Sequence, residues 1–179
     1  FLHILIELCY IIQSKLKNYC EICDQRNLPT VLNLGKHPLC DDLIKIGSKK
    51  KNKLYKIQIA FCKKCVTAYQ KFQVKKKVLF PENYHYRSRL TKDVLHGMNQ
   101  LVSDCRTTLG SLKGKVVLDV GCNDGSLLNI FRKNKSITIG VEPTNAYKDA
   151  QKKGHKIYKG YMDEKISKKI KNNHPKIDV

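Results

Sequence analysis

The chain has 179 residues and a formal net charge of +20, because 35 Lys and Arg residues outnumber 15 Asp and Glu residues. This length accommodates one ordinary domain or two small ones, and a hydrophobic content of 41% is that of a folded protein. Thirty of the basic residues are Lys, and Lys, Ile and Asn all have A/T-rich codons. The positive charge can therefore arise from an A/T-rich genome as well as from binding to a polyanion. The basic residues also lack the interleaved aromatics of a single-strand stacking platform. We therefore expect no nucleic-acid partner, although attraction of a phosphorylated small substrate stays compatible with the charge.

The first twelve residues form a strongly apolar run. A membrane-spanning helix needs ~20 apolar residues, so this run is too short to cross a bilayer. It also lacks the basic start and the small-residue cleavage site of a signal peptide. We interpret residues 1–19 as an apolar N-terminal extension and expect a cytoplasmic protein without a membrane segment. The first residue is not Met, so we also expect the chain to be a fragment of a longer protein.

Four of the eight cysteines form two C-x-x-C pairs separated by 38 residues, namely Cys20, Cys23, Cys62 and Cys65. Each pair directs two sulfur atoms to one point, and two pairs supply the tetrahedron that zinc prefers. The remaining cysteines are scattered, at Cys9, Cys40, Cys105 and Cys122, which favours a reduced compartment over a disulfide framework. We expect a closed, structural zinc site on the four paired cysteines, within a zinc-binding domain at residues 20–80. Redox dithiols or plain buried cysteines are the alternatives.

Two segments have a clear hydrophobic period, one between the two cysteine pairs and one after the second pair. Residues 54–61 alternate between apolar and polar, which predicts a half-buried strand with Tyr55, Ile57, Ile59 and Phe61 on its buried face. From Arg89 to Leu109 the apolar residues recur at helical spacing, which predicts a linker helix within residues 81–113. His96 on this helix is expected at an interface rather than in catalysis.

Residues 114–179 alternate between expected strands and helices. We expect strands at 116–120 and 137–141 and near residue 157, with helices from Ser126 to about 134, from 146 to 153 and from 164 to 171. Ser126 is expected to cap the first helix, and residues 177–179 to begin another strand. This alternation predicts an α/β fold with a parallel sheet.

A glycine turn with the pattern D-x-G-x-x-x-G follows the strand at 116–120, with Asp119, Gly121 and Gly125 at the fixed positions. Such a turn lets the backbone approach a ligand at a helix N-terminus, and Glu142, 17 residues beyond Gly125, is placed to bind ribose hydroxyls. A dinucleotide loop has a second glycine where Asn123 stands, and S-adenosylmethionine (SAM) has positive groups that suit Asp119 and Asp124. The pattern therefore favours SAM over NAD, with an NAD-dependent enzyme or a mere tight turn as alternatives.

These blocks together resemble the SAM-dependent sugar C-methyltransferases that carry an N-terminal zinc-binding domain. The resemblance spans residues 20–179 and rests on the cysteine pairs and the stretches 34–39, 84–88, 119–125 and 140–143. It implies a Rossmann-like SAM-binding domain at residues 114–179, incomplete at its end. It also implies zinc on the paired cysteines and SAM on Asp119, Gly121, Cys122, Asn123, Gly125 and Glu142. Ser88 is a further candidate for the cofactor, and Asp163 for its adenine.

The resemblance implies methylation of carbon beside the keto group of a nucleotide-linked deoxysugar. In this reaction a base removes the acidic proton and the resulting enolate attacks the methyl group of SAM. The resemblance places that base beyond residue 179, so the chain is expected to bind cofactor and zinc and to be inactive alone. Tyr84 and Tyr86 are the candidates for catalysis within the chain, with aromatic packing as their alternative role. The alternative function is a zinc-ribbon nucleic-acid-binding protein or a nucleic-acid methyltransferase.

Overall fold

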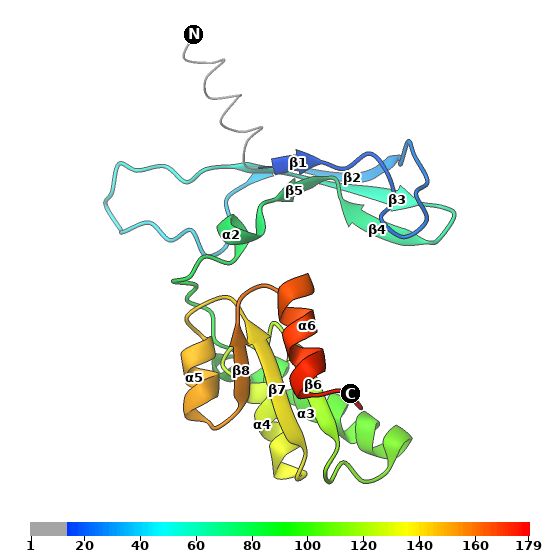
Figure 1. Cartoon of the computed structure of the whole chain (residues 1–179). Helices are drawn as coiled ribbons and strands as arrows, with labels where there is room; N and C mark the ends of the chain where they lie inside the picture. The colour runs from blue at the N-terminus through cyan, green and yellow to red at the C-terminus, as the bar shows by residue number, and fades with distance from the viewer. Residues whose placement is uncertain (1–13) are drawn as a thin grey trace. The chain divides into compact units, whose positions relative to one another are not determined.

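The computed structural model describes residues 14–179 and divides the chain into two compact units, Phe1–Leu79 and Phe80–Val179 (Figure 1). The apolar run of residues 1–12, with Cys9, lies outside the described residues. No helix in residues 14–179 has the length and apolar character that crossing a bilayer requires.

Unit 1 is built from two small antiparallel sheets. Strand β1 (Ser14–Leu16) pairs with β5 (Phe72–Val74), so residues 14–16 of the expected N-terminal extension are part of this unit. The other sheet has the order β2-β3-β4 and consists of Thr30–His37, Tyr55–Cys62 and Thr67–Gln70. A single helical turn, α2 (Lys76–Leu79), closes the unit.

Strand β3 lies at the expected place, but its buried face differs from the prediction. Ala60 and Cys62 are buried at its carboxyl end, whereas Ile59 and Phe61 of the expected face are only half-buried. The cause is Cys62, whose side chain must face the other cysteine pair. Successive side chains in a strand alternate between its two faces, so this requirement also turns Ala60 inward.

Unit 2 contains the parallel sheet predicted from the alternating pattern. The strands are β6 (Val116–Val120), β7 (Ile137–Glu142) and β8 (Lys156–Lys159), in that order. The helices are α3 (Lys92–Leu109), α4 (Ser126–Lys133), α5 (Tyr147–Lys152) and α6 (Glu164–Asn173). A short 3-10 turn, η1 (Ser88–Leu90), precedes α3, so the long helix begins three residues later than predicted. The mixed α/β class is thereby confirmed.

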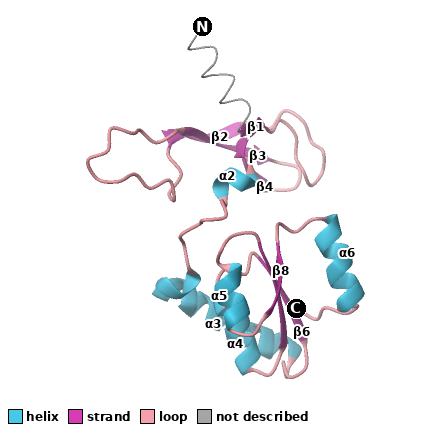
Figure 2. Cartoon of the chain, turned by 60° about the vertical axis from the view of Figure 1, so that its left-hand side comes forward, coloured by secondary structure: helices cyan, strands magenta, loops and turns pink. Residues whose placement is uncertain are grey.

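Helices cover both faces of this sheet (Figure 2). One face buries Val117 against residues of α3, α4 and α5, namely Val102, Leu128, Phe131 and Ala150. The opposite face packs Val116, Leu118, Ile139, Val141 and Tyr158 against Ile166 and Ile170 of α6. The two helices that join β6 to β7 and β7 to β8 therefore share one face, and α6 crosses to the other.

The segment after α6 returns to the edge of β6. The Asp178 N–H donates to the Val116 carbonyl (2.8 Å), and the Leu118 N–H donates to the Val179 carbonyl (2.9 Å). On the other side of β6, the Ile137 N–H of β7 donates to the carbonyl of the preceding residue, Lys115 (2.9 Å). Because backbone groups of successive strand residues point to opposite sides, residues 178 and 179 lie on the edge of β6 away from β7. Strand β6 is therefore flanked on both sides.

Candidate functional site

The two cysteine pairs lie on two tight turns of unit 1. Cys20 and Cys23 belong to a turn closed by hydrogen bonds from the Cys20 N–H to the Gln25 carbonyl (2.8 Å) and from the Asp24 N–H to the Cys20 carbonyl (2.9 Å). Cys62 ends β3, and Cys65 lies in the connection from β3 to β4. The fold thus brings together cysteines that are about 40 positions apart in the sequence.

The four sulfur atoms lie within 4.8 Å of one another. The Sγ atoms of Cys20 and Cys65 are 3.3 Å apart and those of Cys23 and Cys62 are 3.6 Å apart, well beyond the ~2.05 Å of a disulfide bond. Four thiolates around one zinc ion at the usual Zn–S distance of ~2.3 Å would be ~3.8 Å apart. The cluster therefore has the composition and nearly the dimensions of a tetrahedral zinc site.

Two hydroxyl groups contact the sulfur atoms from outside the cluster. The Tyr69 hydroxyl hydrogen-bonds to the Cys20 Sγ, and the Thr67 hydroxyl lies 3.3 Å from the Cys65 Sγ. Burial opposes ionisation of Cys20, but hydrogen bonds from Tyr69 and the Ile22 N–H outweigh it and lower the pKa of this thiol to about 6. A thiolate is the form that binds a metal, so these contacts favour the binding state.

The glycine turn of unit 2 connects β6 to α4, with Gly121, Asn123 and Gly125 in the left-handed region at φ values of 85°, 49° and 74°. Helix α4 begins at Ser126, with Gly125 at the capping position, so the prediction that Ser126 caps it is wrong. A Cβ atom on Gly125 would lie 2.9 Å from the Cβ atom of Ala150. Gly125 is therefore required by its backbone conformation and by the close packing of α5.

Two carboxylates stand at the carboxyl edge of the sheet beside this turn. Asp119 lies near the end of β6, and Glu142 is the last residue of β7, the neighbouring strand. Burial, and to a smaller extent the negative charge of Glu142, raises the pKa of Asp119 to about 6. A cationic ligand at this edge would relieve the repulsion and favour the ionised pair.

The buried Glu142 carboxylate is held in a fixed orientation by its neighbours. One oxygen accepts the Asn123 N–H (2.9 Å), and the other accepts the N–H (2.8 Å) and the hydroxyl (2.5 Å) of Thr144. A carboxylate has about four acceptor positions, so three donors leave room for an incoming hydroxyl. Glu142 is thus positioned by the turn it faces.

Asp124 does not face this edge as a free negative charge. Its fully buried carboxylate accepts the hydroxyl (2.6 Å) and the N–H (3.2 Å) of Ser126, and the Arg89 guanidinium lies 3.1 Å away. Burial would raise the pKa of Asp124, but these hydrogen bonds and the charge of Lys153 outweigh it and lower that pKa. The expectation that Asp124 balances cofactor charge is therefore not supported, because protein groups already neutralise it.

A segment that precedes α3 crosses the same edge of the sheet. We call residues 80–90 the strap. The hydroxyl of Tyr161, which follows β8, donates to the Phe80 carbonyl (2.8 Å). The N–H of Asn145, which follows β7, donates to the Glu82 carbonyl (2.7 Å). The strap therefore passes from the end of β8 to the end of β7.

The strap then reaches the glycine turn after β6. The Ser88 N–H donates to Asn123 Oδ1 (3.0 Å), and Asn123 Nδ2 donates to the Tyr86 carbonyl (3.2 Å). Ser88, a predicted cofactor residue, is buried at this contact. The Tyr84 ring packs edge-to-face on Phe80 and Tyr86, with ring centroids 5.7 and 6.4 Å apart. This is the aromatic packing considered as the alternative role of the two tyrosines.

The structure also places three other residues named from the sequence, Cys122, Asp163 and His96. The Cys122 thiol is buried in the core, where it would contact a Cβ atom on Gly140, so only its backbone is available to a ligand. Asp163 caps α6 by accepting the Ile166 N–H (2.8 Å), and its approach to the adenine stays a prediction. His96 is exposed on α3.

Sequence reasoning missed the ionic contacts that fasten the strap. The Asp149 carboxylate of α5 binds Arg87 (2.9 Å) and Arg89 (3.0 Å), and the hydrogen bond from Arg89 contributes most to lowering the pKa of Asp149. These partners are about 60 positions apart in the sequence, so no local pattern marks them. Thr144 was also missed, although its place two residues after Glu142 fits a local side-chain turn.

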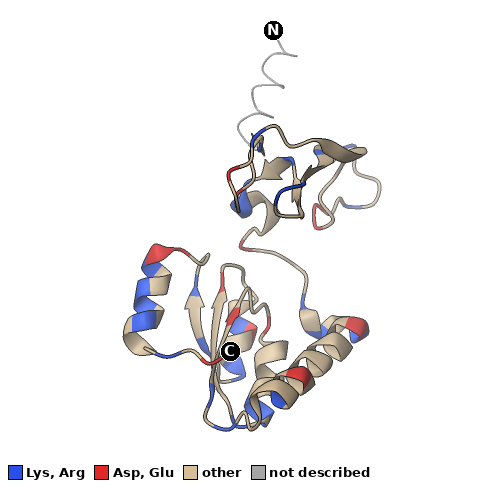
Figure 3. Cartoon of the chain, turned by 90° about the vertical axis from the view of Figure 1, so that its right-hand side faces the viewer, with Lys and Arg blue, Asp and Glu red and all other residues tan. Residues whose placement is uncertain are grey.

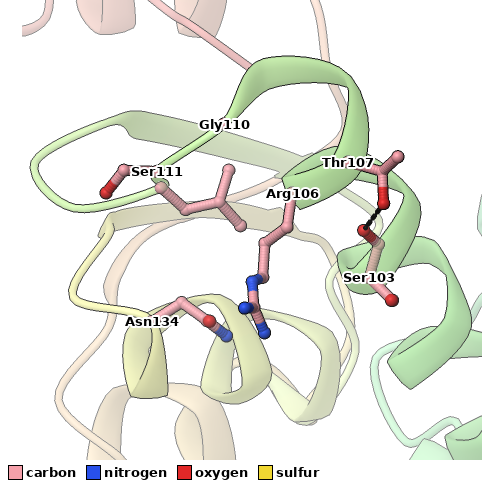
Figure 4. A pocket seen from close by; sticks show the side chains of 7 residues that line it. Ser103, Arg106, Thr107, Gly110, Ser111 and Asn134 are labelled. Carbon is pink, nitrogen blue, oxygen red and sulfur yellow. Dashed lines mark hydrogen bonds between the residues drawn. The ribbon is translucent and has the colours of Figure 1, made fainter.

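A pocket of about 580 Å³ lies elsewhere in unit 2 (Figure 4). It is lined by Ser103, Arg106, Thr107, Gly110, Ser111, Leu112 and Asn134. Residues 110–112 precede β6 and Asn134 precedes β7, so the pocket lies at the amino edge of the sheet. Ligands of open α/β sheets bind at the carboxyl edge, which leaves the glycine turn as the candidate cofactor site.

Lys and Arg residues occur along both units. Figure 3 shows Lys and Arg on ribbons of both units, with several on α6.

Comparisons with known proteins find relatives of both units. A family model described as "Putative zinc binding domain" matches residues 20–80, and one described as "Methionine biosynthesis protein MetW" matches residues 104–176. The chain is 25% identical over 125 residues to the C-methyltransferase NovU of Streptomyces niveus. That match covers 69% of this chain but only 30% of the length of NovU.

Proposed function

The chain is a relative of the sugar C-methyltransferases with an N-terminal zinc-binding domain, and on this premise we propose that it belongs to a SAM-dependent enzyme that methylates carbon. The observation that carries the proposal is the glycine turn after β6, with Asp119 and Glu142 beside it at the carboxyl edge. Because NovU is described as a C-methyltransferase, transfer to carbon is the form of methylation that the relationship favours.

The arrangement of unit 2 supports a Rossmann-like fold for the cofactor domain. Helices α4 and α5 pack on one face of the sheet, α6 packs on the other, and residues 178–179 pair with the free edge of β6. In a doubly wound sheet, later strands are added on the opposite side of the first strand, so the strand order reverses beside it. Ligands bind at the carboxyl ends of the strands at this point. The glycine turn lies at that point.

Asp119, Glu142 and the glycine turn would hold SAM, which supplies a methyl group bound to a positive sulfur. The Asp119 carboxylate would balance the positive amino-acid end, and the remaining acceptor position of Glu142 would bind a ribose hydroxyl. Gly121, Asn123 and Gly125 shape the turn so that its backbone can approach the ligand. The Cys122 backbone and the buried Ser88 remain candidates for secondary contacts.

The four paired cysteines would hold a structural zinc ion. The match to a zinc-binding domain and the cluster of four thiols support this assignment. Four protein ligands leave no position for a reactive water, so the ion would stabilise unit 1 and take no part in hydrolysis.

A small molecule, namely a nucleotide-linked keto-deoxysugar, is the substrate that we propose. A carbon beside a keto group can be deprotonated and can then accept a methyl group, and a nucleotide phosphate would be attracted by the positive chain. The unpaired thiols of the metal cluster support a reducing compartment, for which the cytoplasm is the proposal.

Calorimetric titration of the purified chain tests cofactor binding. S-adenosylhomocysteine is expected to bind with measurable heat, and NADH is not. Replacement Glu142→Ala should weaken binding at least ten-fold, about 1.4 kcal/mol, because it removes the ribose acceptor. Binding of NADH in place of S-adenosylhomocysteine would refute the assignment.

A separate titration tests the nucleic-acid alternative, which the charge of +20 and the two cysteine pairs favour. A steep loss of RNA or DNA affinity between 50 and 200 mM salt, on the order of a thousand-fold, would support that alternative against the small-molecule function.

A further inference from the structure

One side chain of the glycine turn, that of Asn123, contacts the strap at two points. Its Oδ1 accepts the Ser88 N–H (3.0 Å), and its Nδ2 donates to the Tyr86 carbonyl (3.2 Å). Its own N–H donates to Glu142 Oε2 (2.9 Å). One residue of the turn therefore contacts both the strap and the carboxylate proposed to bind ribose.

The backbone of Asn123 explains how its side chain reaches the strap. Asn123 has a φ of 49°, a left-handed conformation that asparagine tolerates better than other residues with a side chain. A glycine would adopt this φ equally well but would offer no amide to the strap. Asparagine therefore combines the backbone freedom of the turn with two side-chain hydrogen bonds.

Ionic contacts add to this attachment on the side of α5. Arg87 and Arg89 of the strap bind Asp149 (2.9 and 3.0 Å), and the Arg89 guanidinium also lies 3.1 Å from the buried Asp124. These contacts hold the strap against the helix and the turn at the same time. They do not reach Glu142, so Asn123 alone among these groups connects the strap to that carboxylate.

We propose that Asn123 is a positioning residue that fastens the strap across the carboxyl edge and couples its position to cofactor binding. This inference rests on the proposed function. A ligand bound to Glu142 fixes the carboxylate that accepts the Asn123 N–H, and thereby fixes the amide that holds Ser88 and Tyr86. Occupation of the site and closure of the strap then stabilise one another.

The variant Asn123→Gly tests the coupling, because it keeps the backbone conformation and the N–H to Glu142 and removes only the side-chain contacts. In the chain without ligand, we expect the Ser88 amide to exchange with solvent about ten-fold faster, since its acceptor is lost. We also expect S-adenosylhomocysteine to bind about ten-fold more weakly, the effect of roughly 1.4 kcal/mol of lost coupling. In the wild-type chain the ligand should slow exchange at Ser88, and in the variant it should not.

Two further variants separate this role from a general loss of stability. Asn123→Asp keeps the acceptor for the Ser88 N–H and should keep that amide protected. Lys135→Gly introduces glycine at another left-handed position (φ 65°), in the turn between α4 and β7, and should change neither exchange at Ser88 nor affinity.

The outcomes separate the two proposals. If Asn123→Gly leaves exchange at Ser88 unchanged, the fastening is wrong, whatever binds. If exchange rises but affinity and ligand-dependent protection match those of the wild type, the coupling is wrong. If the wild-type chain binds no S-adenosylhomocysteine, the proposed function fails, and the exchange measured without ligand still decides the fastening.

Discussion

At the scale of single residues, the sequence identified the groups that bear charge but not the partners that decide their roles. Asp119 and Asp124 are five positions apart and were expected to act alike, yet Asp124 is neutralised by Arg89 and Lys153 and Asp119 is not. The difference arises from a strap residue 35 positions away and from a lysine beyond α5. Such partners follow from the fold, so local spacing could not reveal them.

The raised pKa of Asp119 predicts that this carboxylate destabilises the folded chain at neutral pH. Its folded pKa of about 6 exceeds the ~3.9 of an exposed aspartate, so the folded state binds more protons and its stability falls as pH rises from ~4 to above 6. Asp119→Asn should therefore stabilise the chain at pH 7.5 by on the order of 1–3 kcal/mol, and by almost nothing at pH 4. Urea unfolding at both pH values measures the difference.

His155 changes the stability with pH in the direction opposite to Asp119. The free energy of unfolding of the variant is therefore compared with that of the wild type at the same pH. Burial, aided by the charges of Arg132 and Lys153, lowers the pKa of His155 to about 4, and the stability this histidine contributes is lost as pH falls from ~6.5 to 4. Both chains carry His155, so its contribution cancels. An Asp119→Asn variant that is less stable than wild type at pH 7.5 would contradict the prediction.

Tyr69 is another residue whose role the sequence did not indicate. Its hydroxyl contacts the Cys20 sulfur, and a hydrogen bond to a ligand atom commonly changes metal affinity 10–100-fold. Tyr69→Phe should therefore lower zinc affinity by about ten-fold, measured by competition with a chromophoric chelator. The matched control is Tyr55→Phe, a buried tyrosine on β3 that is outside the core cluster of the cysteines. Equal zinc affinity of Tyr69→Phe and wild type would show that the hydroxyl contributes nothing.

At the scale of elements, periodicity and glycine spacing sufficed for most of unit 2. The strands at 116–120 and 137–141 and the glycine turn were expected within one or two residues of their observed ends, because each has a local signature. The strap has no such signature, since it is irregular and is held by residues that follow three different strands. Strand β2 was not predicted either, because all eight of its residues are exposed and its apolar residues follow no buried face.

Gly140 shows how closely the sheet packs against the glycine turn. A Cβ atom there would lie 2.5 Å from the Cys122 sulfur and 2.7 Å from Ile157 Cδ1, although the backbone of Gly140 itself is unstrained. Gly140→Ala should therefore destabilise the chain by about 1–3 kcal/mol through overpacking, measured by chemical unfolding. The double variant with Cys122→Ala should recover part of this loss, because the smaller side chain makes room. Strictly additive effects would contradict the proposed contact.

At the scale of the molecule, the two units differ in what stabilises them. The core cluster of unit 1 at the cysteine turns consists of Cys20, Leu28, Ala60 and Cys62, whereas unit 2 has packed cores on both faces of its sheet. Small units with little apolar core commonly depend on a metal ion. The cysteine spacing predicted that dependence on a metal ion. The resemblance to the sugar C-methyltransferases predicted that the zinc-binding unit precedes an α/β unit. The compact division itself falls between Leu79 and Phe80.

Removal of zinc should therefore unfold unit 1 and leave unit 2 folded. After treatment with a strong chelator, the NMR amide signals of residues 19–74 should move to the chemical shifts of an unfolded chain. Those of residues 92–173 should keep their chemical shifts. A Cys62→Ser variant should behave in the same way without chelator. Loss of signals from both units together would show that the two are not independent, and no loss from unit 1 would show that it needs no metal.

Amide chemical-shift mapping of the ¹⁵N-labelled chain with S-adenosylhomocysteine tests whether the glycine turn at the carboxyl edge holds SAM. We expect the ligand to perturb the amides of Asp119–Gly125 and Glu142–Thr144, and also the amide of Ser88 in the strap. Shifts gathered around Arg106, Ser111 and Asn134 at the amino-edge pocket, or no shifts at saturating ligand, would contradict it.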